Sequence, residues 1–129
     1  MALEKWVDRI LKTDWSEEQI SKFIGPYNGS FFSYATDHLT RSNAASGGTV
    51  TAILDNLLNR HAIDAALVCN LEVVDGKVEA NFKLARTHAD LLESQGSNYI
   101  STRFSSQAME LIRNFEGNLA VVCLPCDAR

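Results

Sequence analysis

The chain has 129 residues, a length that favours one domain and allows a hydrophobic core without disulfide staples. Its 46% apolar and 22% charged residues exclude wholesale disorder, and a net charge of −4 excludes a generally basic nucleic-acid binder. Because its apolar runs are shorter than the ~18 residues of a membrane span and no signal-peptide pattern opens the chain, we expect a cytoplasmic protein without a membrane partner.

The first 24 residues are predicted to form a helical segment. Apolar residues recur at helical spacing over 3–11. Ser16 and Gln19 have the spacing of a capping box that opens a second short helix. We therefore separate an N-terminal helical segment, 1–24, from an α/β domain, 25–129.

The rest of the chain alternates between helical and strand patterns. The expected elements are a short strand at Phe31–Ala35, a helix at Val50–Asn59, strands at Ala62–Cys69, Leu71–Val74 and Lys77–Leu84, a short helix opened by Thr87 and Asp90, a helix within 105–117 and a strand at Asn118–Leu124. Asp75-Gly76 is a hairpin turn signal between two of these strands. The pattern predicts an α/β fold: a layered mixed sheet with central parallel strands, one antiparallel hairpin and flanking helices.

The last predicted strand, Asn118–Leu124, is almost entirely apolar, so we expect it to lie inside the sheet. Only five residues follow it, and we therefore expect the chain to be truncated at its C-terminal end. An apolar strand with an unpaired edge invites another chain, which predicts self-association or a need for the missing portion.

A glycine loop, Ser46-Gly47-Gly48-Thr49, directly precedes the helix at Val50–Asn59. Two interpretations stay open: a plain turn with a helix N-cap, or a loop that lets a phosphate or cofactor approach the backbone N–H groups, with Arg41 as a fixed charge. Under the second interpretation, a β-branched residue in place of Gly47 is expected to block that approach and leave the fold largely intact.

Cys123 and Cys126 have C-x-x-C spacing near the end of the chain. A thioredoxin-like dithiol is disfavoured because that fold continues well beyond its motif, and zinc is disfavoured because the histidines are too scattered to complete four ligands. Two alternatives remain. Both thiols are packed structural residues, or Cys126 is an exposed ligand or redox thiol while Cys123 is a buried strand residue.

Four features follow one another between residues 25 and 127. They are Arg41 with Ala45-Ser46-Gly47-Gly48 before an apolar helix, the run Ile63–Val68, the loop Gly96-Ser97-Asn98-Tyr99-Ile100, and the end Ala120–Asp127 with its proline-cysteine turn. In this order they resemble the beta-subunit family of coenzyme F420 hydrogenases and dehydrogenases.

The resemblance implies an electron-transfer oxidoreductase domain of an iron–sulfur flavoprotein, which passes electrons between a [4Fe-4S] cluster, FAD and a soluble acceptor such as coenzyme F420. The residues that it places near the flavin are Ser46, Gly47, Gly48, Thr49, Ser97 and Tyr99. It makes Cys126 a cluster ligand, and it implies a redox partner protein or a missing C-terminal domain, with neither cofactor held tightly by this chain alone. The alternative is a non-catalytic interaction domain or fragment that binds no cofactor by itself.

Overall fold

The computed structural model describes residues 16–26, 28–29, 31–124 and 126–127. The chain divides into two compact units, 1–32 and 33–129, each of which is described by itself. The helix predicted over 3–11 and the residue Pro125 lie outside the described residues.

In the first unit, the described helix is α2 (Glu17–Ile24). Ser16 caps it: its Oγ accepts from the Gln19 N–H at 3.3 Å, and its own N–H donates to the Gln19 side chain at 3.0 Å. The helix ends at Gly25, whose φ of +79° is one that glycine adopts without steric cost. The two hydrogen bonds between Ser16 and Gln19 confirm the predicted capping box.

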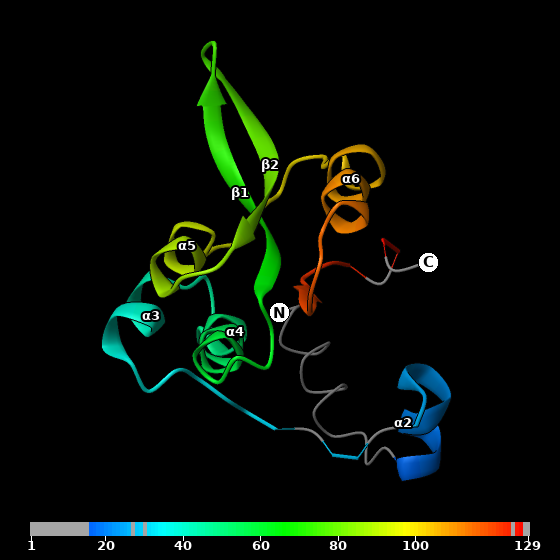
Figure 1. Ribbon diagram of the computed structural model, residues 1–129. Helices are drawn as coiled ribbons and strands as arrows, with labels where there is room; N and C mark the ends of the chain where they lie inside the picture. Colours follow the sequence, from blue (N-terminus) through cyan, green and yellow to red (C-terminus); the bar gives the residue numbers. More distant parts are fainter. Residues whose placement is uncertain (1–15, 27, 30, 125, 128–129) are drawn as a thin grey trace, which may run out of the picture. The chain divides into compact units, whose positions relative to one another are not determined.

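A three-stranded mixed sheet forms the centre of the second unit (Figure 1). β1 (Ala65–Val74) lies between β2 (Lys77–Ala85) and β3 (Leu119–Val121), antiparallel to β2 and parallel to β3. Asp75 and Gly76 make the hairpin turn, with φ values of +50° and +74°. Both values are positive, as a two-residue turn of type I′ requires, and the predicted hairpin is confirmed.

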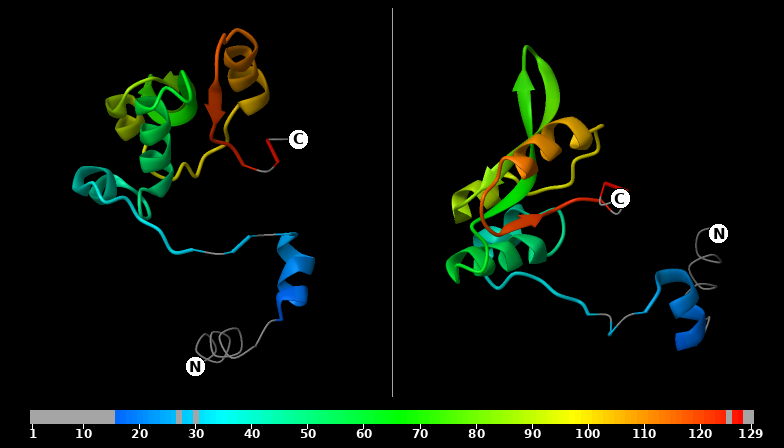
Figure 2. Two further views of the ribbon diagram at one scale, coloured as in Figure 1. Left: turned by 60° about the horizontal axis from the view of Figure 1, so that its bottom comes forward. Right: turned by 45° about the vertical axis from the view of Figure 1, so that its right-hand side comes forward.

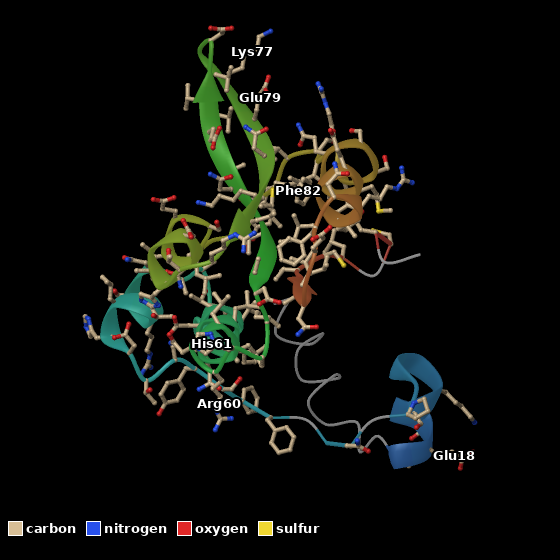
Figure 3. All side chains as sticks on the ribbon, viewed as in Figure 1. Glu18, Arg60, His61, Lys77, Glu79 and Phe82 are labelled. Carbon is tan, nitrogen blue, oxygen red and sulfur yellow. The ribbon has the colours of Figure 1, made fainter. Side chains whose placement is uncertain are left out.

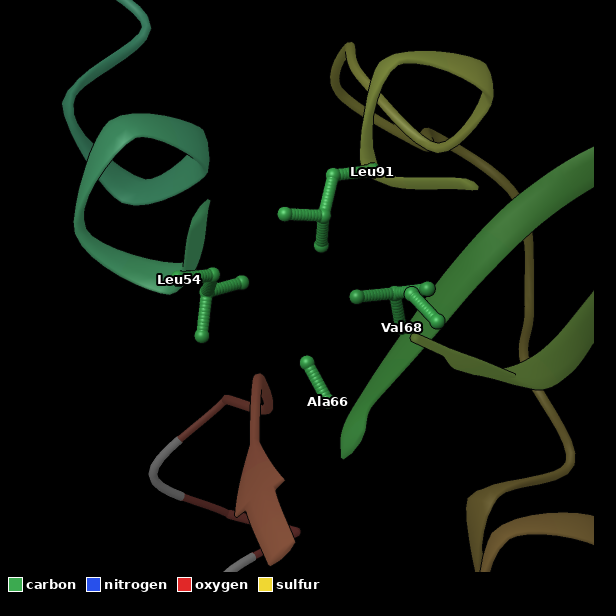
Figure 4. Packing of buried hydrophobic residues seen from close by; sticks show 5 residues of the cluster. Leu54, Ala66, Val68 and Leu91 are labelled. Carbon is green, nitrogen blue, oxygen red and sulfur yellow. The ribbon is translucent and has the colours of Figure 1, made fainter. Parts of the chain in front are cut away.

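Helices cover both faces of this sheet (Figure 2). The helices of the second unit are α3 (His38–Asn43), α4 (Thr49–Asn59), α5 (His88–Glu93), the π-helical turn η1 (Phe104–Ala108) and α6 (Met109–Arg113). On one face, Leu54 of α4 and Leu91 of α5 pack against Ala66 and Val68 of β1 (Figure 4). Together with Ala85 of β2, these side chains form one half of the core.

The opposite face of the sheet is covered by η1 and α6. Leu67 of β1, fully buried, packs against Phe104 and Ala108 of η1. Phe82 of β2 meets Phe104 edge to face, with the ring centroids 5.4 Å apart, and lies on the α6 side of the hairpin (Figure 3). With a core on each face, the layered α/β fold with its mixed sheet is confirmed.

Two of the helices have the termini that the sequence predicts. α4 ends at Asn59 and is followed by Arg60 and His61 (Figure 3), where His61 takes a φ of +54° and donates its N–H to the Leu58 carbonyl at 2.9 Å. At the start of α5, the Asp90 carboxylate accepts from the N–H groups of Arg86 and Thr87 at 3.0 Å each. The Thr87 hydroxyl donates to the same carboxylate at 2.8 Å. The bond from the Arg86 N–H, followed by that from the Thr87 hydroxyl, holds the pKa of Asp90 below its usual 3.8.

The last strand differs from the prediction. β3 is an edge strand of three residues, and the expectation of a buried strand over Asn118–Leu124 is wrong, since Val122, Cys123 and Leu124 are exposed. Residues 31–35 are not a strand, and the strands predicted at Ala62–Cys69 and Leu71–Val74 are one continuous strand, β1.

Competing hydrogen bonds explain why β3 stops. The Leu67 carbonyl accepts from the Val122 N–H at 3.1 Å, which is the last ladder bond. The next carbonyl on that edge, of Cys69, accepts instead from the Asn98 side-chain amide at 3.2 Å. The N–H of Leu124, which would have been its partner, donates to the Asp127 carboxylate at 3.3 Å. Both groups are satisfied elsewhere, so the ladder cannot continue.

None of the helices within the described residues has the length and apolar character needed to cross a membrane.

Candidate functional site

A cavity of about 400 Å³ opens beside the N-terminus of α4. Three parts of the second unit surround it: the glycine loop with α4, the buried half of β1, and the segment that follows α5. The residues that line it are Ala44, Ala45, Ser46, Gly47, Gly48, Thr49, Val50, Thr51, Leu54, Val68, Cys69, Leu91, Ser94, Gln95, Gly96, Ser97, Asn98 and Val122. Its volume is at the lower end of the ~300–1,000 Å³ typical of ligand pockets.

The glycine loop forms one wall of the cavity and packs tightly on its own chain. Gly48 caps α4 with a φ of +72°, and the Gly47 carbonyl accepts from the Ala35 N–H at 2.7 Å. A Cβ on Gly47 would lie 2.7 Å from the Ser33 carbonyl oxygen, and a Cβ on Gly48 would lie 2.8 Å from that of Thr40. The expectation that a β-branched residue at Gly47 leaves the fold intact is therefore wrong, because it would displace backbone.

The opposite wall is fixed by two side-chain amides. The Gln95 Nε2 donates to the Thr40 carbonyl at 2.9 Å and to the Thr51 hydroxyl at 3.0 Å. Asn98 donates to the Cys69 carbonyl on β1 at 3.2 Å. These bonds tie the segment after α5 to α3, α4 and β1, so the cavity walls are held by side chains from distant parts of the sequence.

The lining of the cavity is uncharged. It contains no aspartate, glutamate, lysine, arginine or histidine, and its polar groups are hydroxyls and amides above an apolar floor that includes Leu54, Val68, Leu91 and Val122. A second open depression, between β2 and α6, carries the carboxylates of Glu72 and Glu110 and would repel a phosphate-bearing ligand. The first cavity is thus the better site for a neutral ring with an anionic tail.

Two kinds of unsatisfied backbone and side-chain groups lie along the first cavity. The first intrahelical bond of α4 is donated by Ala52 to Gly48 at 3.0 Å, so the N–H groups of the preceding turn have no partner in the helix. The Gln95 Oε1 is buried without a hydrogen-bond partner among the described residues. A ligand phosphate or carbonyl oxygen is a suitable acceptor for the N–H groups at the start of α4.

The structure brings most of the sequence-predicted flavin residues together. Ser46, Gly47, Gly48, Thr49 and Ser97 all line the first cavity.

Two residues singled out in the sequence lie elsewhere. Tyr99 is 92% exposed and outside the lining, so its assignment stays a prediction. Arg41 is also outside the lining, and its guanidinium lies 4.1 Å from the centre of the Tyr34 ring. Gln95, by contrast, was missed, because no local motif distinguishes it.

The three cysteines do not form a metal site by themselves. Cys69 is partly buried on the cavity wall, whereas Cys123 and Cys126 are exposed and free. Within the described part of the chain, no three His, Cys, Asp or Glu residues are grouped so as to hold a metal ion. A four-iron cluster needs about four thiolates, so the residues of this chain do not fit one alone.

The thiols are expected to differ in reactivity. Burial raises the pKa of Cys69, so less of it is thiolate at a given pH, and the cavity wall also limits access. We expect iodoacetamide at pH 8 to label Cys123 and Cys126 about tenfold faster than Cys69, measured by peptide mass spectrometry. In urea the three rates should converge. Equal rates in the folded chain would contradict the placement of Cys69.

The fold and the cavity define a small α/β domain with one uncharged, ligand-sized site beside a helix N-terminus. The chain belongs to the family described as coenzyme F420 hydrogenase/dehydrogenase, beta subunit N-terminal part, whose sequence profile matches residues 31–108, more than half of the chain. The resemblance drawn from the four sequence features is thereby confirmed.

A solved structure supports the same family. The xenon-derivatized F420-reducing [NiFe] hydrogenase complex from Methanosarcina barkeri contains a chain that matches this one with a TM-score of 0.58 and 26% sequence identity. The match covers 72% of this chain and 32% of the solved chain, so this chain spans about a third of that chain's length. Comparison with curated proteins gave no match.

Proposed function

We propose that this chain is the flavin-binding N-terminal part of an electron-transfer oxidoreductase, in which electrons pass between a [4Fe-4S] cluster, FAD and a soluble acceptor such as coenzyme F420. The observation that carries the proposal is that two loops far apart in the sequence, Ser46–Thr49 and the one containing Ser97, line the same uncharged cavity. The family supports the same conclusion.

The cavity residues would bind and orient the cofactor. FAD, when bound, supplies the electron-transfer chemistry. The apolar floor suits one face of a planar ring and excludes water from it, while the N–H groups at the start of α4 suit a phosphate or a ring carbonyl. Because the cavity holds about 400 Å³, it suits one portion of the dinucleotide, and the remainder would extend past the exposed Ser46 and Ser97.

Cys126 would contribute one thiolate to the cluster. It is exposed in the turn closed by the Asp127 N–H and the Leu124 carbonyl at 2.9 Å, where a partner can reach it. The other thiolates would come from outside this chain, from a redox partner protein or further polypeptide. Cys126→Ser should then lower the iron content of the reconstituted assembly, and Cys69→Ser should not.

A flavin titration tests the proposal. Ser97 is exposed, makes no hydrogen bond to another described residue and lines the cavity, so Ser97→Phe fills the site without disturbing the fold. Ser101, exposed in the same segment but outside the lining, provides the matched control Ser101→Phe. We expect FAD fluorescence to be quenched on adding the chain, with affinity at least about tenfold weaker for Ser97→Phe and unchanged for Ser101→Phe.

Two outcomes would contradict this assignment. If neither the chain nor the reconstituted assembly binds FAD, the alternative of a non-catalytic interaction domain is favoured. If FAD binds equally to both variants, the flavin site lies elsewhere.

A further inference from the structure

The outer half of the β1–β2 hairpin is an exposed sheet with little cover. It extends past α5 and α6, with Lys77 and Glu79 near its far end (Figures 1 and 3). Val73 is 74% exposed, and Val78, directly opposite it in the register, is 56% exposed. Leu71, on the same face, is 44% exposed. One face of this hairpin is therefore an apolar strip that continues from the covered core.

The outer edge of β1 also has unpaired backbone groups. The two-residue turn makes Val74 and Lys77 a hydrogen-bonded pair, so even-numbered residues of β1 bond to β2 and odd-numbered residues face the other edge. On that other edge, the Leu67 carbonyl bonds to Val122 and the Cys69 carbonyl to Asn98. No described strand pairs with β1 beyond Leu67 on this side. Among the described residues, none hydrogen-bonds to the N–H and C=O groups of Leu71 and Val73 on this edge.

The polar face of the same hairpin is acidic. Of the four charged residues between 70 and 81, three are acidic and only Lys77 is basic. Glu72 and Glu79 are directly opposite each other, a pairing of like charges that destabilises a sheet. The Glu72 carboxylate accepts from the side-chain amides of Asn70 and Asn81 at 3.1 and 3.0 Å. These bonds fix the position of the carboxylate but do not neutralise its charge. A cation placed beside this pair would relieve the repulsion.

We propose that the edge of β1 at Leu71 and Val73 receives an extended segment of a partner protein in which apolar and basic side chains alternate. A strand added to an open sheet edge forms main-chain hydrogen bonds with that edge, and the contacts of its alternate side chains determine the specificity. Its apolar side chains would lie beside Leu71 and Val73, and its basic ones beside Glu72. A second copy of this chain is disfavoured as the occupant, because it would bring another acidic hairpin face to the same place.

A peptide titration tests this surface on the full chain. The probe is a capped seven-residue peptide in which lysine and valine alternate. The controls are a peptide of the same composition with its lysines and valines in separate blocks, and one in which glutamate and valine alternate. We expect the probe alone to bind and to slow amide hydrogen exchange at Leu71 and Val73, with weaker binding as salt is raised.

Three variants locate the contact. Val73→Pro removes an N–H that β2 does not use, so it should keep the hairpin and weaken probe binding at least about tenfold. Val73→Thr keeps the N–H and the β-branched shape, so it should bind within about twofold of the unaltered chain. Glu72→Gln should weaken binding about threefold, the size expected for one exposed ion pair.

The proposal is overturned if the blocked or acidic peptide binds as tightly as the probe, or if exchange slows elsewhere and not at Leu71 and Val73. It is also overturned if these two amides become protected in the chain alone as its concentration rises, since a second copy would then be the occupant. Exchange in the unaltered chain decides these outcomes even if Val73→Pro does not fold.

Discussion

Replacing Leu67 by alanine is expected to lower the free energy of unfolding by about 3–5 kcal/mol. Leu67 has 0% exposure and lies in the central strand, where it packs against Phe104 and Ala108. Truncating it removes the contacts of Leu67 with η1 and leaves a cavity that rigid neighbours cannot fill. Because a domain of this size has only about 5–15 kcal/mol of stability, the loss would be a large fraction of the total.

Val73→Ala provides the matched control for Leu67→Ala. Val73 is in the same strand and on the same face, but it is 74% exposed, so its truncation should cost less than about 0.5 kcal/mol. Urea unfolding is best followed by far-UV circular dichroism, because both tryptophans, Trp6 and Trp15, lie in the first 32 residues and not in the unit that contains the sheet. A cost for Leu67→Ala no greater than that for Val73→Ala would contradict the described core.

The features that could be predicted from the sequence are those set by neighbouring residues. Asp75-Gly76 places the hairpin, because few residue pairs accept two positive φ values in succession. The apolar spacing after Gly48 gives α4 to within one residue, and Thr87 with Asp90 marks the start of α5. For the same reason the glycine loop could be named as a site, since its residues are consecutive.

The features that could not be predicted depend on partners far away in the chain. How far the last strand extends along β1 depends on Asn98, which donates to the Cys69 carbonyl that a longer strand would need. Gln95 holds the cavity wall through Thr40, 55 residues before it. The apolar composition of 118–124 is equally compatible with a central and an edge strand. No residue near Gln95 in the sequence indicates which groups it hydrogen-bonds. The sequence therefore predicts the loops of the candidate site but not the long-range hydrogen bonds that hold these loops in place.

The role of Gly48 can be separated from that of an ordinary turn glycine by a matched pair of substitutions. Gly48 and Gly76 have almost the same φ, +72° and +74°, so alanine meets the same backbone strain at each, about 1 kcal/mol. A Cβ at Gly76 has no atom within 4 Å, whereas one at Gly48 would lie 2.8 Å from the Thr40 carbonyl oxygen and 3.3 Å from the Ala35 Cβ. The Thr40 carbonyl cannot move freely, because Gln95 donates to it at 2.9 Å.

Gly48→Ala is therefore expected to destabilise the ligand-free chain by about 2–4 kcal/mol, against about 1 kcal/mol for Gly76→Ala, in the same urea experiment. The excess measures the contact with Thr40, because the backbone strain is common to both variants. A glycine needed solely for the approach of a ligand would show no excess when the ligand is absent. Equal losses of stability would indicate that Gly48 is needed for ligand binding alone. The expected excess would show that Gly48 is required for the packing of the cavity wall, even without a ligand.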